Sequence, residues 1–281
     1  MSSRGKLHLA SLLVAALLVA PMSADSRQAA AAGPQDVLSK AAHYLNDYRE
    51  QLTYVMATER YTQKLTGGYS QYDMEEELAS DVYFVYVPAD NVWMAIRDVE
   101  IVDGKVLKER ENVRAILNSG TMGAARALKD KNARYNLGTI VRNFNEPTLS
   151  LLLLDAGHRS KINILQSKTS GTRTTVSCIE VAGPTLITNV DGTPAYARGE
   201  FVLDTATGRV ERAELHVRLG IVDAVLTTTY KIDGKLKMWV PSRFEESYLE
   251  DGRRPQRISG RADYTDYTRF DVEVRIKTPH P

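Results

Sequence analysis

Apolar and polar residues alternate over much of the C-terminal half of the chain. Ala213, Leu215, Val217 and Leu219 are separated by charged or polar residues, and the same period of two runs from Val222 to Ile232 and from 270 to 276. This period is typical of a β-strand with one buried and one solvated face. Turn sequences occur between such segments, at Asp191-Gly192, Thr207-Gly208, Asp233-Gly234 and Asp251-Gly252. The pattern predicts long antiparallel strands joined by short turns.

The pattern in the first third of the chain changes from a helical period to a strand period. A helix is expected to begin at Gly33-Pro34, because apolar residues recur every three or four positions at Leu38, Ala41, Leu45, Tyr48 and Leu52. Residues Thr53 to Leu65 are rich in β-branched residues and tyrosine, which favours a strand that ends at Gly67-Gly68. Two further strands are predicted at Asp81–Val87 and Val92–Val102, and Asp103-Gly104 marks a tight hairpin.

A helical period returns between Glu109 and Asn136. One face is predicted to hold Val113, Ile116 and Leu117, and another to hold Ala124, Ala127, Leu128, Lys131 and Tyr135. The apolar run Leu149 to Leu154 is interpreted as a buried helix or strand. The sequence therefore predicts a single α+β domain over residues 35–277 with a helical insertion at 109–155, in which the helices gather on one face of the meander.

The first residues have the features of a secretory signal peptide. Arg4 and Lys6 precede an apolar stretch from Leu7 to Ala20, and Pro21 and small residues follow it. We expect a signal peptide over residues 1–24, with cleavage after Ala24 or as late as Ala32. The apolar stretch is shorter than the roughly 20 residues that span a bilayer, although a retained anchor is the alternative. The mature chain is predicted to be periplasmic or extracellular, with no transmembrane segment.

Composition and charge limit the partners. The chain has 36 basic and 35 acidic residues, so no strong field favours nucleic acid. With 43% hydrophobic residues it has enough apolar side chains to form a core. The single cysteine, Cys178, cannot form an intramolecular disulfide and is interpreted as a small buried hydrophobic residue.

No catalytic or metal motif is present in the sequence. The five histidines (His8, His43, His158, His216 and His280) show no ligand spacing, so we predict neither a metal site nor a cofactor. An acidic run, Glu75 to Glu77 beside Asp73, is interpreted as a solvated loop because it lacks the spacing of a calcium loop. His158 lies near Asp155 and Ser160, but no nucleophile motif accompanies it, which favours an ordinary loop histidine.

The order of the predicted elements, across about residues 35–277, resembles the half-barrel of the lipoprotein carriers of the LolA/LolB type. This resemblance implies an incomplete antiparallel barrel with helices packed on its concave side, a concavity for acyl chains, and no catalytic residues. The stretches 84–111, 132–140 and 239–248 also resemble a set of exported bacterial proteins, and that similarity implies no activity.

Three hypotheses for function follow. The first is a non-catalytic periplasmic or secreted binding protein for a lipid, lipoprotein or other apolar ligand. The second is a cell-envelope scaffold or interaction protein that holds a protein partner at a sheet edge or on its helical block. The third is a hydrolase that uses His158 or a carboxylate such as Asp98. The same apolar residues would also fill an ordinary core. For the first hypothesis, the candidate lining residues are Phe84, Trp93, Met94, Ile96, Leu226, Tyr230, Met238 and Trp239.

Overall fold

The computed structural model describes residues 33–68, 72–88, 90–110, 112–118, 122–140, 142 and 146–270. The expected signal peptide lies outside these residues, as does the part of the predicted strand beyond Phe270. The first part of the described chain forms α1 (Pro34–Leu52), β1 (Val55–Gly67), β2 (Met74–Val87), β3 (Val92–Val102), β4 (Lys105–Val106), α2 (Val113–Asn118), α3 (Met122–Lys131) and three 3-10 helices, η1 (Asn132–Tyr135), η2 (Leu149–Leu154) and η3 (Ala156–Lys161).

The second part is made almost entirely of strands. They are β5 (Ile162–Ser170), β6 (Arg173–Glu180), β7 (Ile187–Thr188), β8 (Pro194–Ala195), β9 (Arg198–Asp204), β10 (Val210–Leu219), β11 (Val222–Ile232), β12 (Trp239–Glu250) and β13 (Gln256–Arg269). β7 and β8 form a separate two-stranded sheet.

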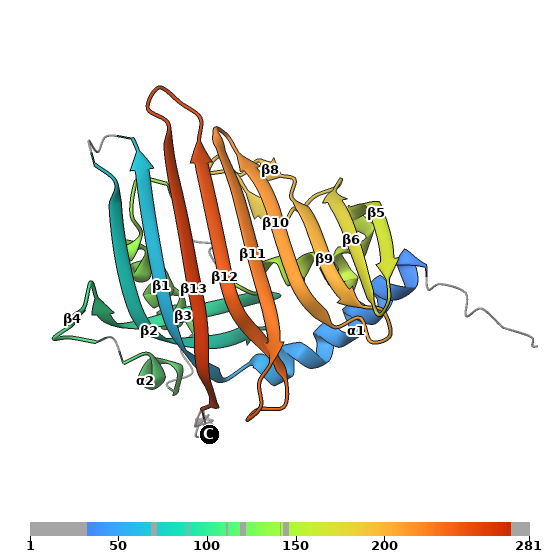
Figure 1. Ribbon diagram of the computed structural model, residues 1–281, viewed down its shortest axis with the longest axis horizontal. Coiled ribbons are helices and arrows are strands. Elements are labelled where there is room, and N and C mark those ends of the chain that lie inside the picture. The colour runs from blue at the N-terminus through green and yellow to red at the C-terminus, as the bar shows by residue number, and fades with distance from the viewer. Residues whose placement is uncertain are drawn as a thin grey trace, which may run out of the picture. The chain divides into compact units, whose positions relative to one another are not determined.

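The other eleven strands form one antiparallel sheet in the order β4-β3-β2-β1-β13-β12-β11-β10-β9-β6-β5 (Figure 1). Pairing of β1 with β13 joins the N-terminal hairpins to the C-terminal meander, from Val55 opposite Arg269 to Gly67 opposite Gln256. The sheet does not close, because β4 and β5 lie at its two opposite edges. The predicted α+β fold, a long antiparallel meander in an incomplete barrel, is confirmed.

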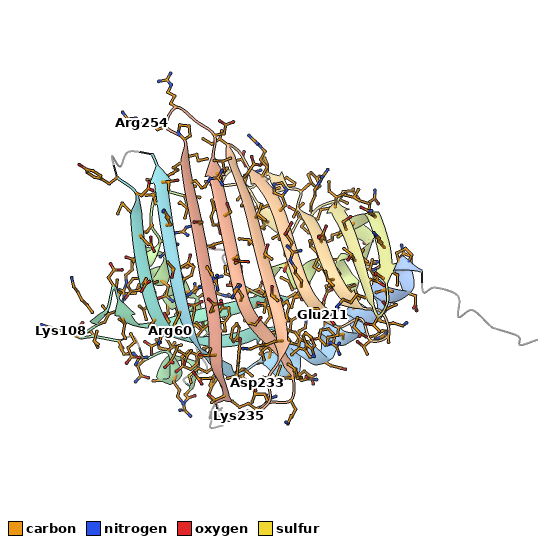
Figure 2. The ribbon with its side chains drawn as sticks, viewed as in Figure 1. Arg60, Lys108, Glu211, Asp233, Lys235 and Arg254 are labelled. Carbon is orange, nitrogen blue, oxygen red and sulfur yellow. The ribbon has the colours of Figure 1, made fainter. Side chains whose placement is uncertain are left out.

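One face of the sheet, called the inner face here, carries the main core. α1 buries the predicted stripe against it, with Leu38, Ala41, Leu45 and Leu52 at most 1% exposed. The run 149–154 forms η2, a buried 3-10 helix that packs into the same cluster. The opposite or outer face is polar over β1 and the meander, and Figure 2 shows the labelled Arg60 among the side chains there.

α2 and α3 depart from the expectation that all helices share one face. They pack with Tyr83, Val85, Met94 and Ile96 of β2 and β3, in a second core on the face opposite to the one that carries Phe84 and Trp93. In the part of the chain that the structure describes, α1 and η2 pack on the inner face, as predicted. Two-sided burial of β2 and β3 explains the difference, since their continuous apolar runs need cover on both faces.

Three local predictions are corrected. The acidic run at 75–77 lies in strand β2, opposite β1, and not in a loop. In α3 the buried residues are Ala125 and Leu128, whereas Ala127 is exposed. Ile232, which the alternation places on the buried face of its strand, ends β11 and is 54% exposed.

The position of α1 depends on a glycine in the β9–β10 turn. Gly208 has φ +73°, and a Cβ added there would lie 2.2 Å from the backbone nitrogen of Ala41 and 2.3 Å from the carbonyl carbon of Lys40. The helix backbone therefore rests directly on this turn. Gly171 in the β5–β6 turn also has positive φ (+59°), but its added Cβ meets nothing within 4 Å.

We expect Gly208→Ala to lower the free energy of unfolding by about 3 kcal/mol or more, because a left-handed conformation and a backbone clash add together. Gly171→Ala, the matched control, carries the conformational cost alone, about 1 kcal/mol. Urea unfolding followed by circular dichroism measures both. Equal losses for the two variants would contradict the contact between α1 and Gly208.

Candidate functional site

The inner face has an apolar part and a polar part. The apolar part lies under α1 and η2, where Tyr48 of α1 lies 6.0 Å from Trp93 and 6.4 Å from Tyr230 between ring centroids. The Tyr48 hydroxyl is buried without a hydrogen-bond partner in the described residues. Aromatic and aliphatic side chains thus make up almost all of this part of the face.

The polar part lies under a segment that we call the crossing segment, residues 132–148, of which 132–140, 142 and 146–148 are described. Gln63 of β1 accepts bonds from the Leu137 backbone (3.2 Å) and from Arg142 Nη2 (2.6 Å). On β11, Thr228 and Tyr230 donate to the Pro147 carbonyl at 2.7 and 2.9 Å. The crossing segment is therefore held over the sheet by side-chain contacts rather than as a strand.

Two buried ion pairs lie in the polar part. Arg97 of β3 makes a bidentate pair with Glu59 of β1, with Nε–Oε2 2.5 Å and Nη2–Oε1 2.9 Å. Arg142 Nη1 donates to Glu246 Oε1 of β12 at 2.7 Å, and both side chains are 0% exposed. Burial makes each pair costly to break, because the remaining ion has no water to solvate it.

Tyrosines complete these pairs. Tyr61 donates to Glu246 Oε1, and Tyr248 donates to Glu246 Oε2 at 3.0 Å. Burial and then the nearby Glu246 charge raise the pKa of both hydroxyls well above the usual value, so they stay protonated and act as donors. The carboxylate of Glu246 thus accepts from three side chains in a site closed to water.

The eight predicted lining residues are divided by the structure. Phe84, Trp93, Leu226, Tyr230 and Met238 come together in the inner core. Met94 and Ile96 lie in the second core, beneath α2 and α3 on the outer face of the sheet. Trp239 is partly buried, with the Arg209 guanidinium 4.4 Å from its ring centroid. A ligand-lining role for these residues stays a prediction.

The polar residues of the inner face were not predicted. The sequence did contain a signal for their burial, because Glu59, Tyr61 and Gln63 fall at alternate positions of β1, on the same strand face as Val55, Ala57 and Leu65. Polar residues at positions that must be buried indicate an internal network. Arg142 lies outside any helix or strand and carried no such signal.

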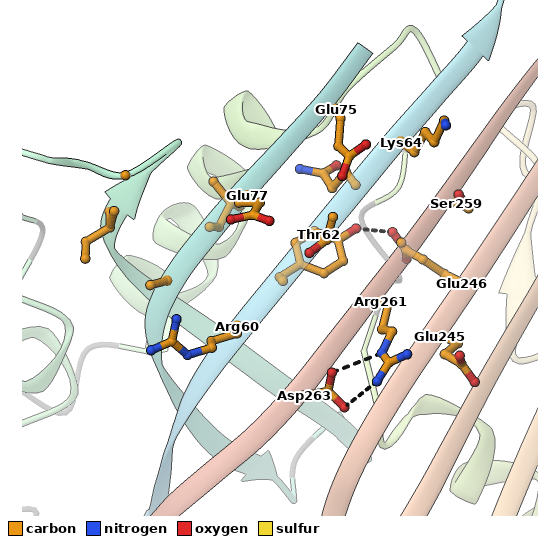
Figure 3. Close-up of a pocket in the computed structure, with 17 residues that line it drawn as sticks. Arg60, Thr62, Lys64, Glu75, Glu77, Glu245, Glu246, Ser259, Arg261 and Asp263 are labelled. Carbon is orange, nitrogen blue, oxygen red and sulfur yellow. Dashed lines mark hydrogen bonds and ion pairs between the residues drawn. The ribbon is translucent and has the colours of Figure 1, made fainter. Parts of the chain in front are cut away.

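The outer face carries a groove of about 860 Å³ over β1, β2, β12 and β13. Figure 3 shows its charges interleaved, with Arg60, Lys64 and Arg261 among Glu75, Glu77, Glu245 and Asp263. Arg261 is itself paired with Asp263 at 3.0 Å. Mixed signs of charge give this groove no preference for an anionic or a cationic ligand.

The candidate catalytic residues have structural partners. His158 Nε2 lies 2.8 Å from Glu180 Oε1, and the same carboxylate accepts from the backbone of Leu186 and Ala197, each at 2.8 Å. Asp98 lies 3.3 Å from Arg110. In the described residues, no group of three or more His, Cys, Asp or Glu could hold a metal ion, and no helix is long and apolar enough to cross a bilayer.

Comparison with known proteins gives similarities of layout only. No family model and no curated protein matches the chain. A LolA superfamily protein of Nitrosomonas europaea is 14% identical, with 87% of this chain and 96% of that one covered and a TM-score of 0.33. A putative outer membrane lipoprotein-sorting protein domain of Vibrio parahaemolyticus is 12% identical, with 83% and 93% covered and a TM-score of 0.35.

A third structure, a DUF1329 family protein of Desulfovibrio piger, is 9% identical, with 85% and 94% covered and a TM-score of 0.37. The predicted likeness to the LolA-type layout is thus found again among solved structures. At these scores the matches say nothing of a ligand, and the fold class rests on the strand order of the chain itself.

The buried pairs give a testable difference in stability. Glu59→Gln leaves Arg97 buried without a counter-charge, so we expect it to cost about 3–5 kcal/mol in unfolding free energy. Asp263→Asn on the outer face, where the carboxylate pairs with exposed Arg243 and Arg261, is expected to cost under about 1 kcal/mol. Urea unfolding of both variants measures the two decreases in unfolding free energy. Similar decreases would mean that the Glu59–Arg97 pair is not desolvated.

Cys178 is confirmed as a buried free cysteine. Burial raises the pKa of its thiol to about 11. Because the thiolate is the reactive form, native protein at pH 8 should be inert to a disulfide reagent and should react fully in denaturant. The matched variant Cys178→Ser with Ser177→Cys moves the thiol to the half-buried outer face and should react in the folded state. Rapid native labelling of Cys178 would contradict its burial.

Proposed function

We propose that the chain is a non-catalytic, exported binding protein for a lipid, a lipoprotein or another apolar ligand, which it takes up on the inner face of its open sheet. The observation that carries this proposal is that helical segments cover the apolar part of the inner face. The apolar part of the inner face is covered by the packed side chains of α1 and η2, to which the short β7–β8 sheet adds Ile187 and Ala195.

Such a cover can be exchanged for ligand at low cost. An acyl chain that replaces the side chains of α1 restores the same kind of contact with the sheet, so apolar surface stays buried. Polar ties hold the helix in place: Arg49 pairs with Asp155, both side chains being 12–13% exposed, and Lys40 Nζ donates to the Thr205 carbonyl at 3.4 Å. These ties set how often the inner face opens.

The candidate lining residues for this role are the five inner-core members, Phe84, Trp93, Leu226, Tyr230 and Met238. Phe84, Trp93, Leu226 and Tyr230 lie on strands from both halves of the sheet, and Met238 directly precedes β12. An extended ligand would therefore contact β2, β3 and β11 together. Structural partners for His158 and Asp98 support the non-catalytic reading, since each carboxylate or imidazole is already engaged.

The first test is native mass spectrometry of the mature protein purified from its own envelope, followed by solvent extraction. We expect a reproducible bound species that is released on denaturation. A uniformly ligand-free mass, together with no binding of a neutral apolar fluorescent probe, would contradict the proposal.

A second measurement uses the helix tie. Asp155→Asn removes the counter-charge of Arg49, so α1 should open more often and the probe should bind roughly five- to tenfold more tightly, because 1.4 kcal/mol corresponds to a factor of ten. Asp47→Asn is the control, since Asp47 is an exposed residue of the same helix, and the affinity of this variant should match that of the parent. Unchanged affinity in Asp155→Asn would show that α1 does not gate the face.

A further inference from the structure

The guanidinium of Arg142 is held in a pocket built by strands distant in sequence. Nη1 contacts Glu246 Oε1 (2.7 Å) and the Tyr61 hydroxyl (3.3 Å), and Nη2 contacts Gln63 Oε1 (2.6 Å). The ring of Tyr248 lies beneath it, 5.6 Å from the guanidinium carbon to the centroid. A carboxylate, oxygen acceptors and an aromatic face are the groups that hold an organic cation.

A missing side chain makes room for this pocket. Gly260 of β13 lies opposite both Gln63 of β1 and Glu246 of β12. A Cβ at that position would lie 2.6 Å from the Tyr61 hydroxyl and 2.8 Å from Glu246 Cγ. The space over Gly260 therefore lets Tyr61 reach across β13 to Glu246.

Arg142 is an imperfect occupant of this pocket. The residue is 1% exposed, yet its Nε is buried without a partner in the described residues. Nη2 also donates to the Leu137 carbonyl (3.1 Å), so the described residues satisfy four of the five N–H groups, whereas a primary ammonium has only three N–H groups to place. Arg142 also lies outside any helix or strand, so its side chain, not a backbone ladder, fixes it here.

The pocket adjoins the apolar part of the inner face. Glu246 is paired across the sheet with Leu226 of β11, a member of the inner core. A ligand whose charged head lies at Glu246 can therefore place the first part of an alkyl chain over Leu226.

We propose that this pocket is a cation-binding site whose occupant in this structure is Arg142 of the chain itself, and that an amphiphile with an ammonium or guanidinium head group displaces it. The inference rests on the proposed function and specifies the head group that the apolar-ligand site accepts. The crossing segment is then an internal competitor for the ligand.

The first experiment replaces the internal occupant in the full mature chain. Arg142→Ala should bind ethylguanidinium, the missing end of the arginine side chain, and at about ten times Kd the melting temperature should rise by about 3–6 °C. Ethylurea, a neutral molecule of the same shape, should give no such rise. The double variant Arg142→Ala/Glu246→Gln should respond to neither.

Equal responses to ethylguanidinium and ethylurea, or an undiminished response in the double variant, would overturn the cation site. If Arg142→Ala does not fold alone, its refolding yield from urea supplies the same comparison: ethylguanidinium must raise the yield above ethylurea.

The second experiment tests displacement in the chain with Arg142 intact. Dodecylammonium, below its micelle concentration, should compete for the fluorescent probe at least tenfold more tightly than dodecanol, and the double variant should lose this preference. Equal affinities would overturn the head-group inference while leaving the apolar site standing. If neither amphiphile binds, the proposed function fails, and the ethylguanidinium result alone decides the cation site.

Discussion

The fold depends on one topological constraint: β4 and β5 are successive strands in the chain, yet they lie at opposite edges of an eleven-stranded sheet. The chain between them must cross about ten strand spacings of roughly 4.8 Å each. α2 and α3 begin this crossing on the outer face of β2 and β3, and the crossing segment and η2 continue it over the inner face. The part of the inner-face cover that η2 supplies is thus a consequence of connectivity.

Buried charge fixes where the crossing runs. The Arg142–Glu246 pair ties the connection to β12, and the Glu59–Arg97 pair ties β1 to β3. Apolar packing alone would tolerate several paths over the same surface, since it has no direction. The buried ion pairs favour one position of the connection over the sheet, and they place charged groups beside the apolar core. The same pairs therefore serve structural specificity and the chemistry proposed for the ligand.

The sequence predicted those features that depend on local period. The stripe of α1, the hairpin at Asp103-Gly104 and the alternation of β10 and β11 are set by neighbours along the chain, and they are confirmed. The polar network depends on which strands become adjacent, as when Gly260 separates Tyr61 from Glu246, and no local pattern encodes that adjacency. The second core escaped prediction for a related reason: a strand buried on both faces has the same apolar run whichever face the helices cover.

The pairing of β1 with β13 has a consequence for biogenesis. Val55 lies opposite Arg269, so residues 214 positions apart in the chain (269 − 55) must meet before the middle of the sheet exists. Until the last strand emerges, β1 presents an unsatisfied backbone edge to its surroundings. Strands that pair over such a long sequence separation form slowly, and partly folded intermediates with unpaired strand edges are prone to aggregate. A chain with this topology therefore cannot complete its sheet until its last strand has been synthesised.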